Sequence, residues 1–495
     1  MVSLANPRPR KMCTRLTVTE AKSSTPTRLS ADAPQISHAV LLMGSQLTRA
    51  LLRLFFVLIA ARALGPGQFG IYTLLLAVVE ILAVISGIGH GEFLSREAAR
   101  EERLGWGVGE QLIGLRIVYA IPLAGAAIGL LGVLGYSRSV LVAGAWMALT
   151  LAPRSMSEAV QGVLRGVGKC WDYLAIDVVL GCALVLGAGV LLFRNGGIVT
   201  AVVAELAAAV AAGTVAFGLF LRRRTKETIR LPWPALVRKS AIFNVYPFVI
   251  NLYDRADVLL LSKLAGDYAT GLYGIAYRPL GTLQLLPYGV LYSLLPTLSR
   301  NPRGRAEKQR LERAMGLLLS AAFGVVLGTM VFADSAVRLL LGERYAVSAV
   351  ALKILIWAVI LRYVNSALNV YLLAGQQERV FLPIAAVCLG VNIIGNLLLI
   401  PIYSWRAAAL LTIATEVVLL VQNVYWLRRT VGYIPKPHGA LRTSLVFSVL
   451  LISVVAGARV IPLLFIGSAG VLLFAAYLYR TGMLREFAEA WRATV

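Results

Sequence analysis

The stretch at residues 381–400 reads FLPIAAVCLGVNIIGNLLLI and has no charged side chain in twenty consecutive positions. As an α-helix, a run of this length spans about 30 Å, which is the thickness of a bilayer's hydrocarbon core. Similar apolar runs recur at 71–88, 173–193, 314–333 and 461–479. Because a backbone in lipid must satisfy its own hydrogen bonds, and barrel strands would be shorter and alternating, these runs predict an all-α polytopic membrane protein.

The composition agrees with that prediction. The chain has 495 residues, of which 58% are hydrophobic and 15% charged, whereas a soluble domain has roughly 25% charged residues. Fourteen spans are expected, at 37–60, 69–90, 108–134, 139–161, 172–193, 198–221, 240–263, 270–295, 314–334, 348–374, 380–401, 406–427, 443–457 and 461–479.

The basic residues predict the orientation in the membrane. The net charge is +24, which in a soluble protein would suggest nucleic acid, but here Lys and Arg lie in the loops between apolar runs. With the N-terminus cytoplasmic, 32 of them fall in cytoplasmic segments and eight in outer ones. This asymmetry predicts a cytoplasmic-membrane protein with both termini inside and no nucleic-acid partner. Residues 1–36 lack the apolar core of a signal peptide and are expected to form a disordered basic tail.

Short sequence matches at a nearly constant offset indicate an internal repeat. The pairs are Gly70 and Gly271, Arg100 and Arg300, Gly181 and Gly390, and Glu205 and Glu416, separated by 201, 200, 209 and 211 residues. The offset covers six spans, so both halves enter the membrane in the same orientation. We therefore expect a six-helix lobe at 37–224, a second lobe at 225–430 in a parallel pseudo-twofold repeat, and two further helices within 431–495.

Several motifs in this order resemble those of polysaccharide biosynthesis membrane proteins. They are ARALGPGQFGIY at 61–72, LSREAAR at 94–100, RADVLLL at 255–261, GLYGIAYR at 271–278 and LLLIP at 397–401. That family contains the O-antigen flippase-like transporters of the multidrug/oligosaccharidyl-lipid/polysaccharide exporter superfamily. The resemblance implies two six-helix lobes around a central cavity, with helices thirteen and fourteen outside. It also implies a lipid-linked oligosaccharide as substrate, and polymerases or glycosyltransferases as candidate partners.

Charged residues inside spans are the candidates for a substrate site, because each costs about 2.5–3.5 kcal/mol at a helix centre and usually faces a cavity or a partner. Ser45, Arg49 and Arg53 follow at intervals of four and form one polar stripe on the first span. Arg255 and Arg278 lie on the seventh and eighth spans, which the repeat places opposite the first two. We expect these four arginines to bind substrate, with paired structural roles as the alternative.

Three acidic residues on the same spans, Glu80, Asp254 and Asp257, are candidates for ion coupling or for polar lining of the cavity. Other embedded charges have simpler expected roles. Arg154 and Glu158 stand four apart and are expected to pair with each other, and Asp177, Glu205 and Glu416 are expected to pair within their lobes.

Arginine suits a diphosphate, because guanidinium is planar, permanently charged and weakly hydrated. By themselves the arginines indicate only an anionic substrate. The family resemblance implies that this substrate is a polyprenyl-diphosphate-linked oligosaccharide, flipped by alternating access. The alternatives are a cation-coupled multidrug antiporter of the same superfamily and, less well supported, a membrane glycosyltransferase or polymerase. Four cysteines and three histidines show no metal-ligand or disulfide spacing, so no metal, no cofactor and no enzymatic activity are expected.

Overall fold

The structure is a computed structural model, which describes residues 33–86, 91–194, 196–225, 228–437, 439–457, 463–480 and 482. Every regular element within these ranges is helical, so the predicted all-α class is confirmed. The predicted tail falls mostly on residues 1–32, which lie outside the described ranges, and α1 begins at Ala33. The helices are α1 Ala33–Ser86, α2 Gly91–Arg100, α3 Glu102–Val133, α4 Arg138–Ala148, α5 Leu151–Gly166, α6 Cys170–Phe193, α7 Ile198–Arg223, α8 Trp233–Leu283, α9 Leu285–Arg300, α10 Arg305–Leu341, η1 Glu343–Tyr345, α11 Ala346–Leu355, α12 Ala358–Ala374, η2 Glu378–Val380, α13 Phe381–Tyr403, α14 Trp405–Thr430, α15 Ala440–Gly457 and α16 Leu463–Arg480.

Seven of the described helices are long and apolar enough to cross a membrane, or eight if the bent pair formed by 343–355 and 358–374 counts as one span. The prediction of fourteen spans is not confirmed as a count. Part of the difference comes from α1, which joins two predicted spans in one element, and from α8, which covers the predicted span 240–263 and part of 270–295 but is not among the seven.

Both long helices break at a glycine, and the two glycines are related by the repeat. Gly65 in α1 has φ 71° and ψ 169°, and Gly266 in α8 has φ 85° and ψ 172°. Positive φ is a region that side chains with a Cβ rarely adopt, so glycine is the expected residue at each break. The two positions are 201 residues apart, the same offset as the sequence matches. Glycine at these positions thus allows the turn between the two arms of α1 and the similar turn in α8.

The second arms of α1 and α8 touch through the paired glycines Gly70 and Gly271. A Cβ placed on Gly70 would lie 1.8 Å from the carbonyl oxygen of Asp267, and one on Gly271 would lie 1.9 Å from that of Pro66. Only residues without a side chain allow backbones to approach this closely. Gly70 and Gly271 therefore bring the second arms of α1 and α8 into backbone contact.

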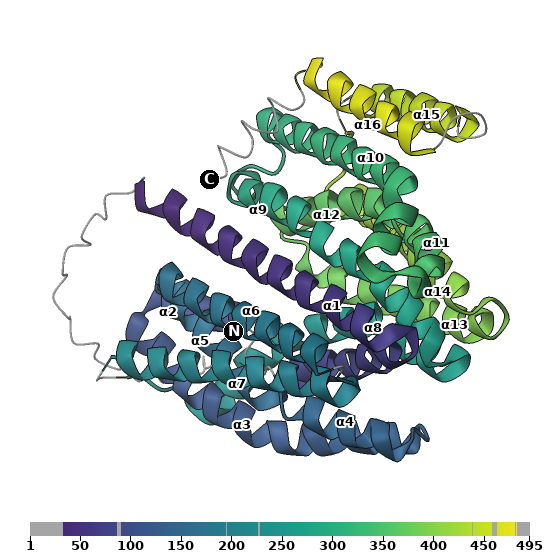
Figure 1. The fold of residues 1–495 in the computed structure, drawn as a ribbon. Coiled ribbons are helices and arrows are strands. Elements are labelled where there is room, and N and C mark those ends of the chain that lie inside the picture. The colour runs from purple at the N-terminus through teal and green to yellow at the C-terminus, as the bar shows by residue number, and fades with distance from the viewer. Residues whose placement is uncertain are drawn as a thin grey trace, which may run out of the picture.

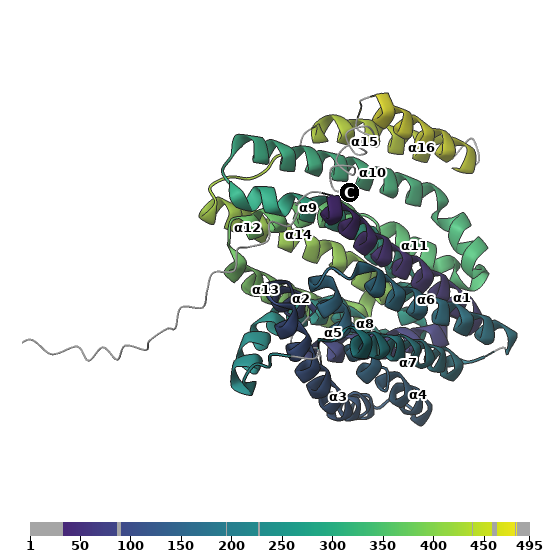
Figure 2. The same cartoon turned by 90° about the vertical axis from the view of Figure 1, so that its left-hand side faces the viewer.

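The remaining helices form two groups that pack mostly within themselves (Figures 1 and 2). Helices α2 to α7 contact one another and α1, whereas α9 to α14 contact one another and α8. The contact between α1 and α8 is the main junction between the groups. Helices α15 and α16 pack on α10 at the edge of the second group, where Phe447 stacks on Phe323 with ring centroids 4.7 Å apart (Figure 1). The lobe limits 37–224 and 225–430 themselves stay a prediction.

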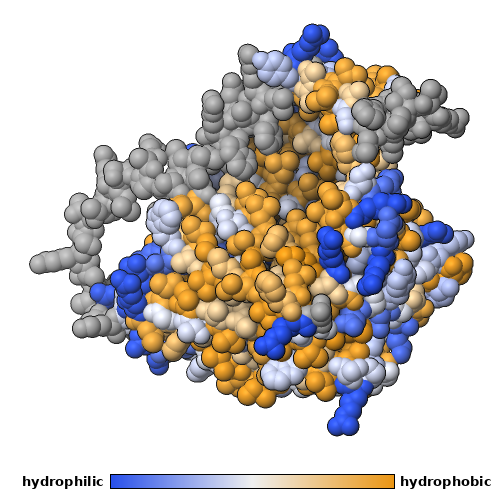
Figure 3. Space-filling model, viewed as in Figure 1, coloured by the Kyte–Doolittle hydropathy of each residue, from blue (hydrophilic) through white to orange (hydrophobic). Residues whose placement is uncertain are grey.

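The outer surface of the helices is apolar. Figure 3 shows hydrophobic side chains across the middle of this face and hydrophilic ones gathered towards the ends of the helices. Phe193 and Val133 are 92% and 88% exposed, and long apolar side chains such as Ile121 and Leu186 are also exposed. Water would not tolerate such a continuous apolar surface, whereas a bilayer requires it, so the chain is a multi-pass membrane protein.

Candidate substrate cavity

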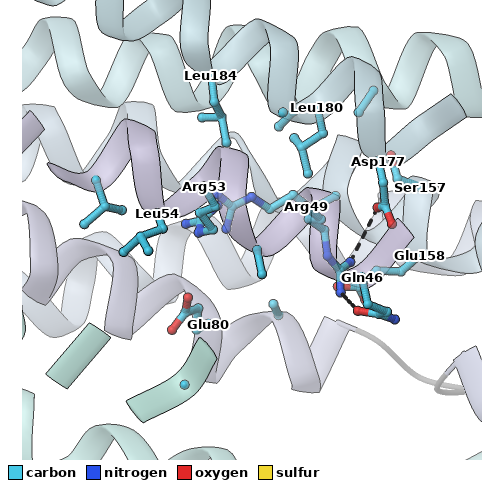
Figure 4. A pocket seen from close by; sticks show the side chains of 18 of the residues that line it. Gln46, Arg49, Arg53, Leu54, Glu80, Ser157, Glu158, Asp177, Leu180 and Leu184 are labelled. Carbon is cyan, nitrogen blue, oxygen red and sulfur yellow. Dashed lines mark hydrogen bonds and ion pairs between the residues drawn. The ribbon is translucent and has the colours of Figure 1, made fainter. Parts of the chain in front are cut away.

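A cavity of about 600 Å³ lies between the two helix groups. Its wall is built from α1, α5, α6 and α7 on one side and from α8 and the start of α9 on the other. All four arginines predicted to bind substrate line it, as does Glu80; they are Arg49, Arg53, Arg255 and Arg278. The polar stripe on the first arm of α1 therefore faces the cavity, as the spacing of four residues predicted (Figure 4).

Arg49 is held from two sides at one end of the cavity. Its guanidinium donates a hydrogen bond to Gln46 at 2.7 Å and lies 3.6 Å from the Asp177 carboxylate on α6 (Figure 4). Asp177 is buried and also accepts hydrogen bonds from Ser45 at 2.6 Å and Gln161 at 2.9 Å. Because the Arg49 side chain is 38% exposed and its ion pair is long, it can turn towards a ligand without leaving Asp177 unsatisfied.

Arg53 belongs to a tighter network centred on Glu205 of α7. The fully buried Glu205 carboxylate lies 3.2 Å from Arg53 and 2.5 Å from Arg154, and it accepts a hydrogen bond from the Tyr72 hydroxyl at 2.5 Å. Arg154 therefore pairs with Glu205, not with Glu158 as expected. Spacing along one helix predicts only partners three or four residues away. It could not reveal Glu205, which lies 51 residues further along the chain than Arg154.

Arg255 and Glu80 form an ion pair that joins the two helix groups. The Arg255 Nε lies 2.6 Å from a Glu80 oxygen, and both side chains are about one-quarter exposed to the cavity. Of the three acidic residues predicted for ion coupling or cavity lining, Glu80 alone lines this cavity. Since α1 supplies Glu80 and α8 supplies Arg255, the pair breaks if the groups separate.

Arg278 differs from the other three arginines. It lines the cavity from the second arm of α8, yet it makes no ion pair and no hydrogen bond to any residue that the structure describes. Asp254 and Asp257, which lie on the same helix, do not pair with it. A permanently charged group in a largely apolar cavity without a protein partner is the strongest sign here of an anionic ligand.

The two predicted acidic residues of the seventh span do not line this cavity. The Asp257 side chain is buried behind the wall, where it accepts hydrogen bonds from the Tyr273 hydroxyl and from the backbone N–H of Val258 at 2.7 Å. Asp254 is likewise absent from the lining, although Asn251, one turn earlier, belongs to it. Their expected position in the cavity is therefore corrected, because α8 turns these side chains towards the second helix group. A role in ion coupling stays a prediction.

The second group contains a counterpart of the Arg154–Glu205 pair that sequence reasoning missed. Arg362 of α12 lies 2.8 Å from Glu416 of α14, which also accepts a hydrogen bond from Asn365 at 3.0 Å. Arg154 and Arg362 are 208 residues apart, close to the 211 that separate Glu205 from Glu416. The repeat offset was the signal that could have revealed them. As expected, Asp177, Glu205 and Glu416 all pair within their own group.

No group of three or more His, Cys, Asp or Glu side chains arranged to hold a metal occurs within the described ranges. His90, His438 and Cys13 lie outside those ranges. The absence of a metal and of a cofactor therefore stays an expectation.

Comparison with known proteins identifies the family. A family model described as polysaccharide biosynthesis protein matches residues 37–301, more than half of the chain. The chain belongs to the polysaccharide biosynthesis protein family. A relative of this chain is a probable low-salt glycan biosynthesis flippase of Haloferax volcanii. The two are 24% identical over 390 residues, which make up 74% of this chain and 78% of that protein.

Solved structures show which fold this member of the polysaccharide biosynthesis family has. The lipid II flippase MurJ in an inward closed conformation matches with a TM-score of 0.69 at 14% identity, covering 89% of this chain and 99% of that one. An inward-facing multidrug resistance transporter of the MATE family, in the MOP superfamily, matches with a TM-score of 0.62 at 16% identity, covering 80% and 98%. Both matches show that this chain has the transporter fold that the family resemblance implied.

Proposed function

We propose that this protein is a flippase that moves a polyprenyl-diphosphate-linked oligosaccharide across the cytoplasmic membrane, for cell-surface polysaccharide biosynthesis. The observation that carries the proposal is the convergence of four arginines on one cavity, with Arg278 unpaired among the described residues. Five arginines and three carboxylates line the cavity in all. Glu80 and Asp177 are already engaged by Arg255 and Arg49, which leaves Arg278 available for a substrate anion.

A diphosphate fits this cavity better than an organic cation does. Guanidinium and phosphate oxygens form parallel, charge-assisted hydrogen bonds, which are strong where water is largely excluded. An antiporter for cationic drugs would need unpaired carboxylates. Of the three in the lining, Glu80 lies 2.6 Å from Arg255 and Asp177 lies 3.6 Å from Arg49, which leaves Glu158 alone against five arginines. Because the fold also matches that of a MATE transporter, cation antiport is the alternative function. We further propose that the protein catalyses no covalent reaction.

Transport would proceed by separation of the two helix groups at one end and their closure at the other. In this structure the groups touch at the end where the Gly65 and Gly266 breaks lie, through Gly70 and Gly271 and a hydrogen bond of 2.8 Å from the Tyr345 hydroxyl to the Ala61 carbonyl. The charge asymmetry of the loops assigns that end to the outside and both termini to the cytoplasm. The structure would then be a state closed to the outside.

The function is tested in cells that lack the gene. We expect deletion to stop export of one surface glycan and to leave its lipid-linked precursor on the cytoplasmic face, because flipping is the only step removed. The measurement is the amount and sidedness of lipid-linked oligosaccharide in membrane vesicles, with a plasmid copy of the gene as the control. Unchanged precursor sidedness, together with new sensitivity to cationic drugs, would favour the antiporter instead.

The orientation is tested by single cysteines in a chain whose four native cysteines are replaced by serine. A cysteine at exposed Asn301, between α9 and α10, should be protected from an impermeant maleimide added outside, because its loop is basic and predicted cytoplasmic. A cysteine at Glu343, which is 71% exposed in η1, should react. Glu343 is a better outer position than Asp267, which is half-buried and accepts a hydrogen bond from Ser262. Reaction at Asn301 in sealed cells would contradict the topology.

A further inference from the structure

Two tyrosines on α9 form an exposed aromatic pair. Tyr288 and Tyr292 stand one helical turn apart, and their ring centroids lie 4.4 Å apart at an interplanar angle of 31°. The residues are 52% and 45% exposed. Val290, on the opposite side of α9, is buried, and α9 packs on α10 and α12 of the second helix group.

The tyrosine pair continues the face of α8 that lines the substrate cavity. Arg278, Thr282 and Leu285 line the cavity at intervals of three and four residues, and Tyr288 and Tyr292 follow at the same spacing. Gln284, which joins α8 to α9, keeps near-helical angles of φ −66° and ψ −18°, so the face is not turned at the junction. Residues at this spacing share one side of a helix. The pair therefore lies about 15 Å along the helix axis from Arg278.

The first helix group supplies polar side chains to the same cavity. The Tyr173 hydroxyl accepts a hydrogen bond of 3.3 Å from Gln46, which itself lines the cavity. Gln46 and Tyr173 therefore place an amide and a phenol beside the cavity whose α8 face the tyrosine pair continues.

We propose that the Tyr288–Tyr292 pair, which continues the cavity-lining face of α8, forms a glycan-binding subsite together with Gln46 and Tyr173. A sugar ring has an apolar C–H face and a rim of hydroxyl groups. The C–H face packs on the electron-rich faces of the tyrosine rings, while the amide and the phenol bond the hydroxyls. This inference rests on the proposed function: the diphosphate binds at Arg278, and the sugars extend along α9 to the tyrosines.

The experiment measures the affinity of the purified full chain for two probes. One is undecaprenyl diphosphate, which has no sugar, and the other is the lipid-linked oligosaccharide extracted from the deletion strain. We expect Tyr288→Ala/Tyr292→Ala to weaken binding of the oligosaccharide probe about tenfold or more and to leave undecaprenyl diphosphate unchanged, because buried aromatic contacts dominate such interfaces. Tyr288→Phe/Tyr292→Phe keeps the ring faces and should retain most of the affinity. Tyr403→Ala, which removes a tyrosine that is 57% exposed at the far end of α13, is the matched control.

The outcomes separate this inference from the proposed function. The glycan subsite would be overturned if the double alanine variant lost affinity equally for both probes, or for neither. Equal loss of affinity for both probes together with a lower melting temperature would assign the pair a structural role. A similar decrease in Tyr403→Ala would identify the tyrosines as general membrane-interface anchors. If the unaltered protein binds neither probe, the flippase proposal fails first.

Discussion

Replacement of Arg278 by alanine is expected to reduce glycan export about 10- to 100-fold while the protein remains in the membrane at its normal level. Arg278 lines the cavity and has no ion-pair or hydrogen-bond partner within the described part of the chain, so its removal leaves no buried carboxylate uncompensated. The loss should therefore appear in transport and not in folding. Arg278→Lys should recover only part of the export, because lysine keeps the charge but lacks the planar fork that fits a diphosphate.

The matched comparisons are two other arginines. Arg338→Ala removes a guanidinium that is 57% exposed and paired with Glu343 outside the cavity, and it should leave export unchanged. Arg53→Ala removes one of three partners of the buried Glu205, so it should also lower the protein level to some extent. Export and membrane abundance are measured together in the deletion strain. If the Arg278→Ala protein is present in the membrane at its normal level and export is normal, Arg278 does not bind the substrate anion.

A disulfide between α1 and α8 is expected to stop transport completely and reversibly. A Cβ added at Gly274 would lie 3.3 Å from the Cβ of Thr73, close to the roughly 3.5–4.5 Å that disulfides need. In a chain free of other cysteines, Thr73→Cys/Gly274→Cys should oxidise readily and hold the helix groups together at the end that must open. Export should fall to background after oxidation and return with dithiothreitol.

A second crosslink distinguishes this lock from general damage by oxidation. Leu94 of α2 and Gly162 of α5 lie in the same helix group, and a Cβ at Gly162 would be 3.1 Å from that of Leu94. Leu94→Cys/Gly162→Cys should oxidise with similar efficiency and leave export at the level of its reduced form, because no motion within a group is required. Undiminished export by a fully oxidised Thr73→Cys/Gly274→Cys chain would refute the separation of α1 from α8.

The positions of the cavity arginines could be predicted from the sequence because they depend on helix formation and on the spacing of residues along one helix. An apolar run of twenty residues must be a helix in lipid, and residues four apart on it share one face, so Arg49 and Arg53 had to point together. The repeat then placed Arg255 and Arg278 opposite them, and the glycine offset of 201 residues reappears as the touching pair Gly70 and Gly271. The same rules failed for Asp257, because they do not say towards which neighbour a helix turns each of its faces.

The sequence by itself thus determined the class of protein, the helical repeat, and which charges lie within the membrane, since composition and periodicity of 3.6 residues decide these. Only the tertiary structure decided which charges are free. Arg53 meets Glu205 across 152 residues, and Arg255 meets Glu80 from another helix group. The energy of a charge in a cavity depends on the groups within about 4 Å of it. Those neighbours come from distant parts of the chain, so only the packed helices distinguish the unpaired Arg278 from its paired companions.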